Sequence, residues 1–540
     1  MYESFATVWE RVADAIPDAP AVVQGERRIT YREVEDRAAR LASALAAYGV
    51  GGDTKVALFL HNCPEYMELL FALSKLRAVP VNVNFRYLGD ELVQLVDNAD
   101  AEVLVYHRSL RDRVEAARDR MPRVRHTVEI DDEGSSSEYE ALLRAHEPAP
   151  RIERSGDDLL LWYTGGTTGL PKGVLWHQGT LLGYGLIAAY ALQDETPTDS
   201  LDRLVADVKR WRARGTPLVS LLTTPLVHAT AVHQANTAFA VGGTIVLLER
   251  GRTDGDTICT TIERERPSVL QIVGDVLMRR IADALDDADA RGEPYDLSSL
   301  ERIHNSGAMV SAPLKDALLS RGTMHVYDSL GSSEAVGFGV ALTTAPGQGE
   351  TARFRLGPNA RLLVAADRDD DVAPGSGDVG VLAVHTSCAI GYYRDPVRSA
   401  ATFRTIDGKL HAIPGDQATL DTDGTLTLLG RGSNCINSGG EKIWPEEVEE
   451  VLKEHPGVTD AVVLGVPDEE WGQLVTAVVA TTGDDPPDAD ALGEWVGDRL
   501  AGYKRPRRFV FADEVGRTTV GKLDYEWARA AVNKGFGAAR

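Results

Sequence analysis

Cysteine is scarce in this chain, with four residues among 540 and no C-x-x-C pair. This spacing disfavours zinc ribbons and thioredoxin-type redox chemistry, and four thiols are too few for a disulfide scaffold. A reducing cytoplasm fits this cysteine content best. The cysteines are Cys63, Cys259, Cys388 and Cys435.

Long apolar stretches and a secretory signal are also missing. No run of 18 apolar residues occurs, so we expect no membrane-spanning helix. The first 20 residues contain acidic side chains and have neither the basic nor the apolar segment of a signal peptide. These absences predict a soluble, cytoplasmic protein without stable membrane insertion.

Positive charge is in deficit. The chain has 57 Lys and Arg against 81 Asp and Glu, which gives a formal net charge of −24. Such a field repels nucleic acid at long range, so we expect no nucleic-acid partner. It does not exclude small anionic ligands, because backbone amides and a lysine can form a local anion site.

Apolar residues make up 43% of the chain, enough for packed interiors. A length of 540 exceeds the ~250–300 residues at which a single core stops growing. Apolar strand-like runs alternate with helical patterns, and a capping box at Thr30–Glu33 predicts a helix over 30–48. The fold class is therefore α/β with parallel sheets.

Two regions depart from this alternation. Residues 350–430 are rich in Gly, Asp and Thr with short strands, which predicts a small β-rich subdomain. After Gly430 a polar, glycine-bearing connector leads into a unit of about 110 residues with an α+β pattern. We expect a large N-terminal domain over 1–431 and a small mobile domain over 432–540.

The segment YTGGTTGLPKG, residues 163–173, carries the strongest chemical signal. A strand ends at Thr164, and glycines, two threonines and Lys172 follow. Glycines let the backbone approach a phosphate, while hydroxyls and a lysine complete an anion site. A glycine-rich hairpin is the plainer interpretation, but it needs neither the hydroxyls nor the lysine. The segment is not a Walker A loop.

Residues 166–173 resemble the phosphate loop of the adenylate-forming superfamily, which includes acyl-CoA synthetases, peptide-synthetase adenylation domains and luciferases. The resemblance extends in order through nearly the whole chain. It implies ATP-dependent conversion of a carboxylic acid into an acyl-adenylate, and then into a CoA thioester. ATP and CoA would be the co-substrates, and Mg²⁺ would be the cofactor.

The resemblance assigns roles to residues of five later motifs. Glu334 would hold Mg²⁺, His228 would border the acyl pocket, Asp416 and Arg431 would contact ribose, and Lys522 would be a mobile catalytic lysine. Thr168 is also predicted to be catalytic. The remaining nucleotide- or CoA-binding candidates are Thr164, Gly165, Gly166, Thr167, Gly169, Lys172, Ser306, Gly307, Ala308, Gly331, Ser332, Ser333, Ser438, Gly439 and Gly440.

Three positions depart from the family pattern. Leu330 replaces an aromatic that stacks on adenine, Ser433 stands at the hinge, and Thr519 replaces a proline near Lys522. The GYYRDP segment at 391–396 matches a family signature that is mainly structural. The resemblance also implies that the small domain rotates about 431–433 between the two half-reactions.

Segments such as VNVNFRYLGDEL and INSGGEKIWPEEVE are most similar to actinobacterial fatty-acid and sterol-acid CoA ligases. A polar segment at 193–216 is shared with that subgroup and is expected to border the acyl side of the site. Fatty, sterol-derived and aromatic acids all stay open as substrates, in fatty-acid or secondary metabolism.

Other outcomes also stay open. The second nucleophile could be an amine or nitrite, as in diazotase-like enzymes, or a carrier protein acting in trans. A non-catalytic binding protein is disfavoured because binding alone does not require a lysine on a moving domain. A homodimer is one expectation for the assembly.

Overall fold

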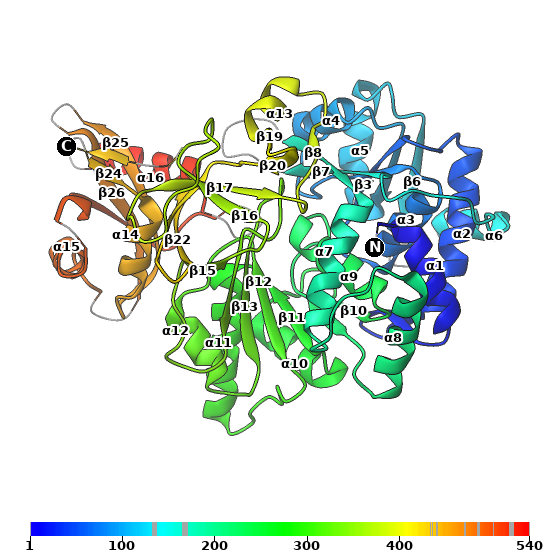
Figure 1. Cartoon of the computed structure of the whole chain (residues 1–540), viewed down its shortest axis with the longest axis horizontal. Helices are drawn as coiled ribbons and strands as arrows, with labels where there is room; N and C mark the ends of the chain where they lie inside the picture. Colours follow the sequence, from blue (N-terminus) through cyan, green and yellow to red (C-terminus); the bar gives the residue numbers. More distant parts are fainter. Residues whose placement is uncertain are drawn as a thin grey trace.

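Two sheets and three helical layers form the large N-terminal part of the chain, and a smaller unit follows at the C-terminus (Figure 1). We analysed a computed structural model. It describes residues 2–131, 138–164, 171–431, 434, 436–438, 441–468, 471–482, 486–500, 502–517 and 523–538.

The larger sheet has 15 strands in the described chain. The neighbours from β13 through β12, β11, β9 and β10 to β1 are parallel, as the alternating pattern predicted. Beyond β13 the neighbouring strands are antiparallel. These strands form the predicted β-rich subdomain. In spatial order the strands are β19 (Phe403–Ile406), β20 (Lys409–Ala412), β17 (Gly380–His385), β21 (Asp416–Leu420), β22 (Thr425–Arg431), β15 (Arg353–Leu356), β14 (Gly339–Thr343), β13 (His325–Leu330), β12 (Arg302–Ser306), β11 (Val269–Ile272), β9 (Val219–Leu222), β10 (Thr244–Leu247), β1 (Pro20–Gln24) and β2 (Arg27–Thr30), with β16 (Ala360–Leu363) on β17.

The second sheet is parallel from β6 to β7 and ends in an antiparallel hairpin. Its strand β7 coincides with the strand predicted before the phosphate loop. In spatial order the strands are β18 (Gly391–Tyr392), β8 (Lys172–His177), β7 (Leu159–Thr164), β4 (Val79–Asn82), β3 (Lys55–Phe59), β5 (Val103–His107) and β6 (His126–Ile130).

The helices cover both sheets and fill the space between them. One core cluster joins apolar side chains of both sheets to α1, α2, α3, α7, α8 and α9, whereas α4 and α5 cover the outer face of the second sheet and α10, α11 and α12 that of the larger sheet. These helices are α1 (Phe5–Ala15), α2 (Tyr31–Ala47), α3 (Pro64–Lys75), α4 (Gly89–Asn98), α5 (Arg111–Ala117), α6 (Glu138–Ala145), α7 (Gln178–Ala191), α8 (Leu201–Ala213), α9 (Ala229–Ala240), α10 (Gly255–Glu265), α11 (Gly274–Arg291), α12 (Ala312–Leu319) and α13 (Pro396–Thr402).

Helix α2 begins where the capping box predicted. The Thr30 hydroxyl accepts a hydrogen bond from the Glu33 amide, and the Glu33 carboxylate accepts one from the Thr30 amide at 2.7 Å. Both contacts satisfy amides that the first helical turn leaves without a partner. Leu41 and Leu45 on the next turns are fully buried, so the amphipathic pattern also predicted the packed face.

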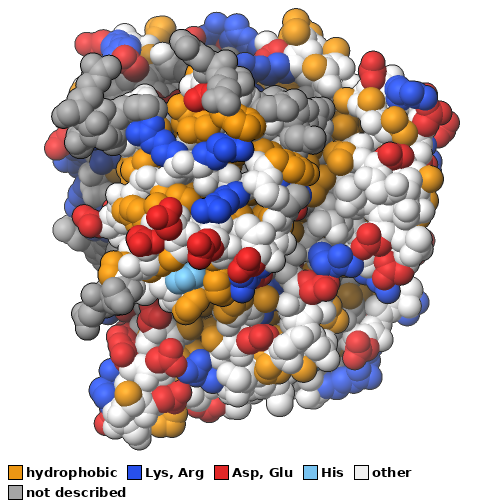
Figure 2. Space-filling model, turned by 90° about the vertical axis from the view of Figure 1, so that its left-hand side faces the viewer, with side chains coloured by type: hydrophobic (Ala, Val, Ile, Leu, Met, Phe, Trp, Pro, Cys, Tyr) orange, Lys and Arg blue, Asp and Glu red, His pale blue; other side chains and the backbone are white. Residues whose placement is uncertain are grey.

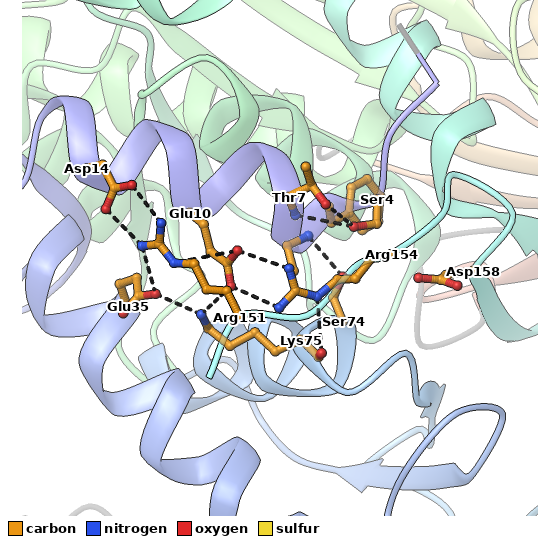
Figure 3. A network of polar contacts seen from close by, with 12 residues as sticks. Ser4, Thr7, Glu10, Asp14, Glu35, Ser74, Lys75, Arg151, Arg154 and Asp158 are labelled. Atoms are coloured by element: carbon orange, nitrogen blue, oxygen red, sulfur yellow. Dashed lines mark hydrogen bonds and ion pairs between the residues drawn. The ribbon is translucent and has the colours of Figure 1, made fainter. Parts of the chain in front are cut away.

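A buried ion-pair network ties α1 and α3 to the segment at 151–154 (Figure 3). The Glu10 carboxylate receives the Lys75 ammonium at 2.7 Å and both terminal nitrogens of Arg154 at 3.0 Å. The Lys75 and Arg154 side chains are only 3% and 2% exposed. Glu35 and Arg151 extend the network towards solvent. Each buried charge therefore has an opposite charge in direct contact.

The C-terminal unit is a sheet with helices on both faces. Helices α14 and α15 pack on one face and α16 on the other. The last strand of the larger sheet ends at Arg431 and the first strand of this unit starts at Ile436, beside the predicted boundary. The elements are β23 (Ile436–Ser438), β24 (Glu441–Ile443), α14 (Pro445–Lys453), β25 (Val458–Asp468), β26 (Gly472–Thr481), α15 (Ala489–Gly497), β27 (Arg508–Ala512) and α16 (Tyr525–Ala538).

Two predictions from the missing features can be compared with this structure. In the parts of the chain that the structure describes, no helix is long and apolar enough to cross a membrane. Cys63, Cys259 and Cys388 are buried free thiols. Cys435 lies outside the described residues.

Candidate active site

A cavity of about 1160 Å³ lies between the two sheets and the C-terminal unit. Its wall is formed by residues at or just beyond the carboxyl ends of the parallel strands β4, β7, β9, β10, β11, β12 and β13. Ligands of α/β proteins bind at this end of parallel strands. Arg517 and residues 523–526 of the C-terminal unit line the same cavity.

The predicted phosphate loop connects the β7–β8 hairpin. Thr164 and Lys172 are opposite each other in the antiparallel register, at the base of the loop. Thr164 and Pro171 line the cavity, so the loop begins and ends at its edge. Gly165, Gly166, Thr167, Thr168 and Gly169 lie outside the described residues.

Two asparagines hold the segment that leads to His228. The Asn62 carboxamide accepts a hydrogen bond from the Leu226 amide at 2.6 Å and donates to the Thr224 carbonyl at 3.1 Å. Asn82 donates to the carbonyls of Tyr163 and Val227, at 2.9 and 2.7 Å. Asn82 therefore fixes the end of β7 against the His228 segment.

Neither asparagine was predicted as a site residue, although the sequence contains a signal for both. Asn82 is the last residue of the buried strand β4, and Asn62 lies three residues beyond β3. Polar side chains at this position in a parallel sheet are placed at the site edge. His228 itself lines the cavity at the start of α9.

The Ser306–Ala308 turn is positioned by a third asparagine. Asn305 donates to the Ala308 carbonyl and to Asp328, both at 2.8 Å, and accepts from the Gly274 amide at 2.8 Å. Gly307 has a φ of 93°, a left-handed conformation that favours glycine. Ser306 and Gly307 line the cavity, whereas Ala308 is not among the lining residues and lies against Gly274.

The segment containing Gly331, Ser332 and Ser333 lines the cavity, and Glu334 is the next residue along the chain. The Ser332 hydroxyl accepts hydrogen bonds from the amides of Glu334 and Ala335, each at 3.2 Å, which fixes the turn. The Trp176 indole donates to the Ser333 carbonyl at 2.8 Å. These contacts join the turn to strand β8.

The Glu334 side chain is hydrogen-bonded to Tyr392 of the GYYRDP segment, a contact that was not predicted from the sequence. The Tyr392 phenol donates to the Glu334 carboxylate at 2.6 Å, and the Glu334 residue is 7% exposed. The Lys172 ammonium lies 5.7 Å from the centre of the Tyr392 ring. Tyr392 thus connects the base of the phosphate loop with the Glu334 carboxylate.

Other predicted residues lie apart from the described cavity lining. Asp416 begins β21 and is opposite Arg431 of β22, so these two predicted ribose contacts are adjacent. Ser438 is buried in the C-terminal sheet, paired with Glu441 and Gly472. Gly439, Gly440 and Lys522 lie outside the described residues, as do Ser433 and Thr519.

The chain on either side of residues 518–522 reaches the cavity. Arg517 and Leu523 form an antiparallel bridge, and both line the cavity. The Arg517 guanidinium is held by both oxygens of Asp460, at 2.6 and 2.7 Å. The C-terminal unit therefore presents this part of its surface to the site.

The segment at 193–216 was predicted to border the acyl side of the site, and this prediction was wrong. None of its described residues lines the cavity. Its helix α8 buries Leu204, Val208 and Trp211 in the main core. The helix also buries Asp207, which accepts a hydrogen bond from Tyr190, so its polar composition concealed a packing role.

A basic stretch at 504–508 lies on the C-terminal unit. Lys504 is held by Glu447 at 2.6 Å, and the Arg507 guanidinium lies 3.8 Å from the centre of the Trp471 ring. Figure 2 views the side of this unit, where Lys and Arg side chains gather beside acidic ones. This surface has mixed charge despite the overall excess of acidic residues.

Two histidines in the cavity wall have shifted pKa values. Burial lowers the pKa of His233 to about 4. Burial, with smaller contributions from His233 and Arg302, lowers the pKa of His304 to about 3. Both imidazoles are therefore neutral at pH 7.

Comparisons with known proteins cover nearly the whole chain. The AMP-binding enzyme family matches residues 9–393, and the AMP-binding enzyme C-terminal domain matches residues 447–522. A medium/long-chain-fatty-acid–CoA/3-oxocholest-4-en-26-oate–CoA ligase of Mycobacterium tuberculosis is 39% identical, covering 97% of this chain and 95% of that protein. An indoleacetate–CoA ligase of Aromatoleum aromaticum is 32% identical, covering 97% of each chain.

Solved structures share the fold. The anthranilate CoA ligase AuaEII in complex with anthranoyl-AMP superposes with a TM-score of 0.83 at 22% identity, covering 99% of this chain and 98% of that one. The amide bond synthetase McbA from Marinactinospora thermotolerans superposes with a TM-score of 0.77 at 27% identity, covering 97% and 99%. The family matches and the full-length relatives confirm the predicted superfamily: the chain belongs to the AMP-binding enzyme family.

Proposed function

We propose that this chain activates a hydrophobic carboxylic acid bound in the cavity between the sheets. The reaction is that of an AMP-forming acyl-CoA ligase. The acid displaces pyrophosphate from ATP to form an acyl-adenylate, and the CoA thiol then displaces AMP to form a thioester. The observation that carries the proposal is a cavity with Thr164, Ser306 and Ser332 in its wall and the C-terminal unit at its edge.

The proposed roles follow the position of each group. Negative charge develops on the α-phosphoryl group and the leaving pyrophosphate, so catalysis needs cations and oriented donors. Lys172 and the 165–170 loop would contact phosphates, while Asp416 and Arg431 would contact ribose. Lys522 would act in adenylation, because its neighbours Arg517 and Leu523 line the cavity.

The Glu334 site fits a magnesium ion that is shared with ATP. Mg²⁺ is commonly held by one or two carboxylates together with substrate phosphates. The described residues contain no cluster of three or more metal-binding side chains, and Glu334 offers one carboxylate oriented by Tyr392. When bound, Mg²⁺ would neutralise phosphate charge. The chain's own contribution is to orient the Glu334 carboxylate beside the nucleotide.

The acid would be of the size range that the relatives indicate, from medium-chain fatty acids to sterol-derived and aromatic acids. The test is pyrophosphate release over a panel of such acids, with and without CoA, followed by mass spectrometry of the products. A thioester supports the proposal. Pyrophosphate release without a thioester from any acid would contradict the CoA step.

The alternative is that an amine, and not CoA, attacks the acyl-adenylate. The structural similarity to the amide bond synthetase McbA favours this alternative. Adding amines or nitrite to the same assay distinguishes these products from a thioester by mass. We also propose a cytoplasmic location, and a homodimer that light scattering would test.

A further inference from the structure

An ion pair joins the C-terminal unit to the N-terminal part of the chain beside the cavity; we call it the bridging pair. Nζ of Lys453, the last residue of α14, lies 3.7 Å from Oδ2 of Asp275, in the first turn of α11. The two side chains are only 11% and 9% exposed. Val276 and Leu277, the next residues of α11, line the cavity. The bridging pair is therefore mostly buried and adjacent to the cavity wall.

Only one oxygen of the Asp275 carboxylate is hydrogen-bonded among the described residues. Oδ1 accepts a hydrogen bond from the Ser311 amide at 2.8 Å, which keeps the carboxylate in place on the N-terminal side. Oδ2 has no hydrogen-bond partner there, and the Lys453 ammonium lies close to it. Burying a charge costs free energy unless an opposite charge compensates for it. The compensating charge near Oδ2 of Asp275 thus comes from the C-terminal unit.

Lys453 has a second carboxylate partner within its own helix. It forms an ion pair with Glu450, three residues earlier in α14. Burial opposes the charged form of Lys453, yet Glu450 and Asp275 together raise the pKa of its ammonium above the ordinary value. Glu450 moves with Lys453, whereas Asp275 does not. A rotation of the C-terminal unit would therefore separate Lys453 from Asp275 and keep its contact with Glu450.

Arg517 is a second cation of the C-terminal unit on which the Asp275 charge acts. Burial opposes the charge of this guanidinium, Asp460 raises its pKa, and Asp275 adds to that increase. Arg517 lines the cavity and precedes the segment that contains Lys522. The Asp275 carboxylate therefore attracts the C-terminal unit at the place where the chain leads to Lys522.

We propose that Lys453 and Asp275 are positioning residues for acyl-adenylate formation, because their ion pair favours the orientation in which the chain around Lys522 reaches the cavity. This inference rests on the proposed function, in which the C-terminal unit rotates before thiolysis. A contact made in one of two orientations shifts the equilibrium towards that orientation. Loss of the bridging pair should therefore slow adenylation and leave thiolysis equally fast or faster.

The first test measures the two half-reactions separately in Asp275→Asn. The asparagine keeps an oxygen that accepts from the Ser311 amide and removes the charge that faces Lys453. We expect the single-turnover rate of pyrophosphate release to fall about tenfold, within the usual range of coupling between two sites. Thioester formation from a pre-made acyl-adenylate should not fall. An equal loss in both steps, or an unchanged first step, would overturn the proposal.

Further variants assign the effect to the bridging pair. Lys453→Met should give the same division between the half-reactions, and the double variant Asp275→Asn with Lys453→Met should lose about as much as either single variant. Glu450→Gln is the matched control, because it removes the Lys453 partner that belongs to the same helix, and it should keep the native ratio of the two rates. An additive loss in the double variant, or the same division in Glu450→Gln, would overturn the assignment.

A distance measurement separates this proposal from the proposed function, because it requires no turnover. Spin labels are placed on Asp287→Cys of α11 and Glu494→Cys of α15, which are both exposed, in a chain with Cys435→Ser. The other three native cysteines are buried. Double electron–electron resonance of the substrate-free chain then reports the orientation of the C-terminal unit relative to α11.

We expect Asp275→Asn to increase the population of a second inter-label distance, relative to the first, by about tenfold. This shift supports the bridging pair even if no acid releases pyrophosphate, a result that would contradict the proposed function alone. Identical distance distributions with and without the substitution would overturn the proposal whether or not catalysis is observed.

Discussion

Two buried polar regions of this chain differ in how their groups are satisfied. In the network around Glu10, the Lys75 and Arg154 side chains are nearly inaccessible, and each has an opposite charge in direct contact. At the cavity between the sheets, His233 and His304 each keep one buried ring nitrogen without a partner among the described residues. A satisfied buried network stabilises a fold, whereas a buried nitrogen without a partner lowers its stability.

The comparison is tested most severely by Glu10→Gln. Removing one partner from a buried ion pair leaves uncompensated charge, which typically costs about 3–5 kcal/mol. We expect a large fall in the thermal midpoint of unfolding. Asp18→Asn is the control, because Asp18 and Arg32 form an exposed pair with side chains 86% and 62% exposed. A similar loss in both variants would remove the distinction between buried and exposed pairs.

Lys522→Ala should have the largest effect on catalysis. Removing a group that stabilises transition-state charge typically costs about 10²–10³-fold in rate. We expect this loss in pyrophosphate release, measured with saturating acid and ATP. Thioester formation from a pre-made acyl-adenylate should stay largely intact, and an equal loss in that step would contradict the assigned role.

The pH dependence of stability should differ between the two regions. The folded pKa values of His233 and His304 lie below the ordinary 6.5, at about 4 and about 3. Between pH 6.5 and each folded pKa, the unfolded chain binds more protons than the folded chain. Each histidine therefore lowers the free energy of unfolding by about 1.4 kcal/mol per pH unit as the pH falls through this range. His233→Phe and His304→Phe should therefore lose less thermal stability than the native chain between pH 7 and pH 4.5. Parallel curves would contradict this.

Tyr392→Phe should have a smaller effect, concentrated on magnesium. The variant loses the hydrogen bond to Glu334, and a hydrogen bond to a charged group contributes about 1.5–3 kcal/mol. We expect an increase in the Mg²⁺ concentration that gives half-maximal pyrophosphate release. Tyr393→Phe, which removes a hydrogen bond to Asp100, is the neighbouring control. An equal increase in both variants would argue against a role for Tyr392 at the metal.

The smallest expected change is in the stability of His233→Phe at pH 7. Replacing a partnerless buried polar group by an apolar one of similar shape is nearly neutral or stabilising. Calorimetry should give a thermal midpoint close to that of the native chain. A large destabilisation would contradict the view that the unpaired nitrogen of His233 lowers the stability of the native chain.

The sequence predicted those features that depend on neighbouring residues. The capping box at Thr30 marked the start of α2, and the apolar run before the phosphate loop coincides with β7. Motif order along the chain identified the family. The α+β pattern after Gly430 also predicted the C-terminal unit.

Features that depend on the meeting of distant strands were not predicted. Asn82 contacts Val227 across 145 residues, and His233 meets His304 only because α9 packs over the larger sheet. No local pattern encodes such a meeting. The β23–β24 hairpin was also missed, because its short strands lie within a glycine-bearing connector.

The most direct test of the account is an isotope transfer experiment. The acid is supplied with ¹⁸O in both carboxylate oxygens, together with ATP, Mg²⁺ and CoA, and the products are weighed by mass spectrometry. Adenylation followed by thiolysis predicts one ¹⁸O atom in the AMP released, together with pyrophosphate and an acyl-CoA thioester. Unlabelled AMP, or ADP and phosphate in place of AMP and pyrophosphate, would contradict it.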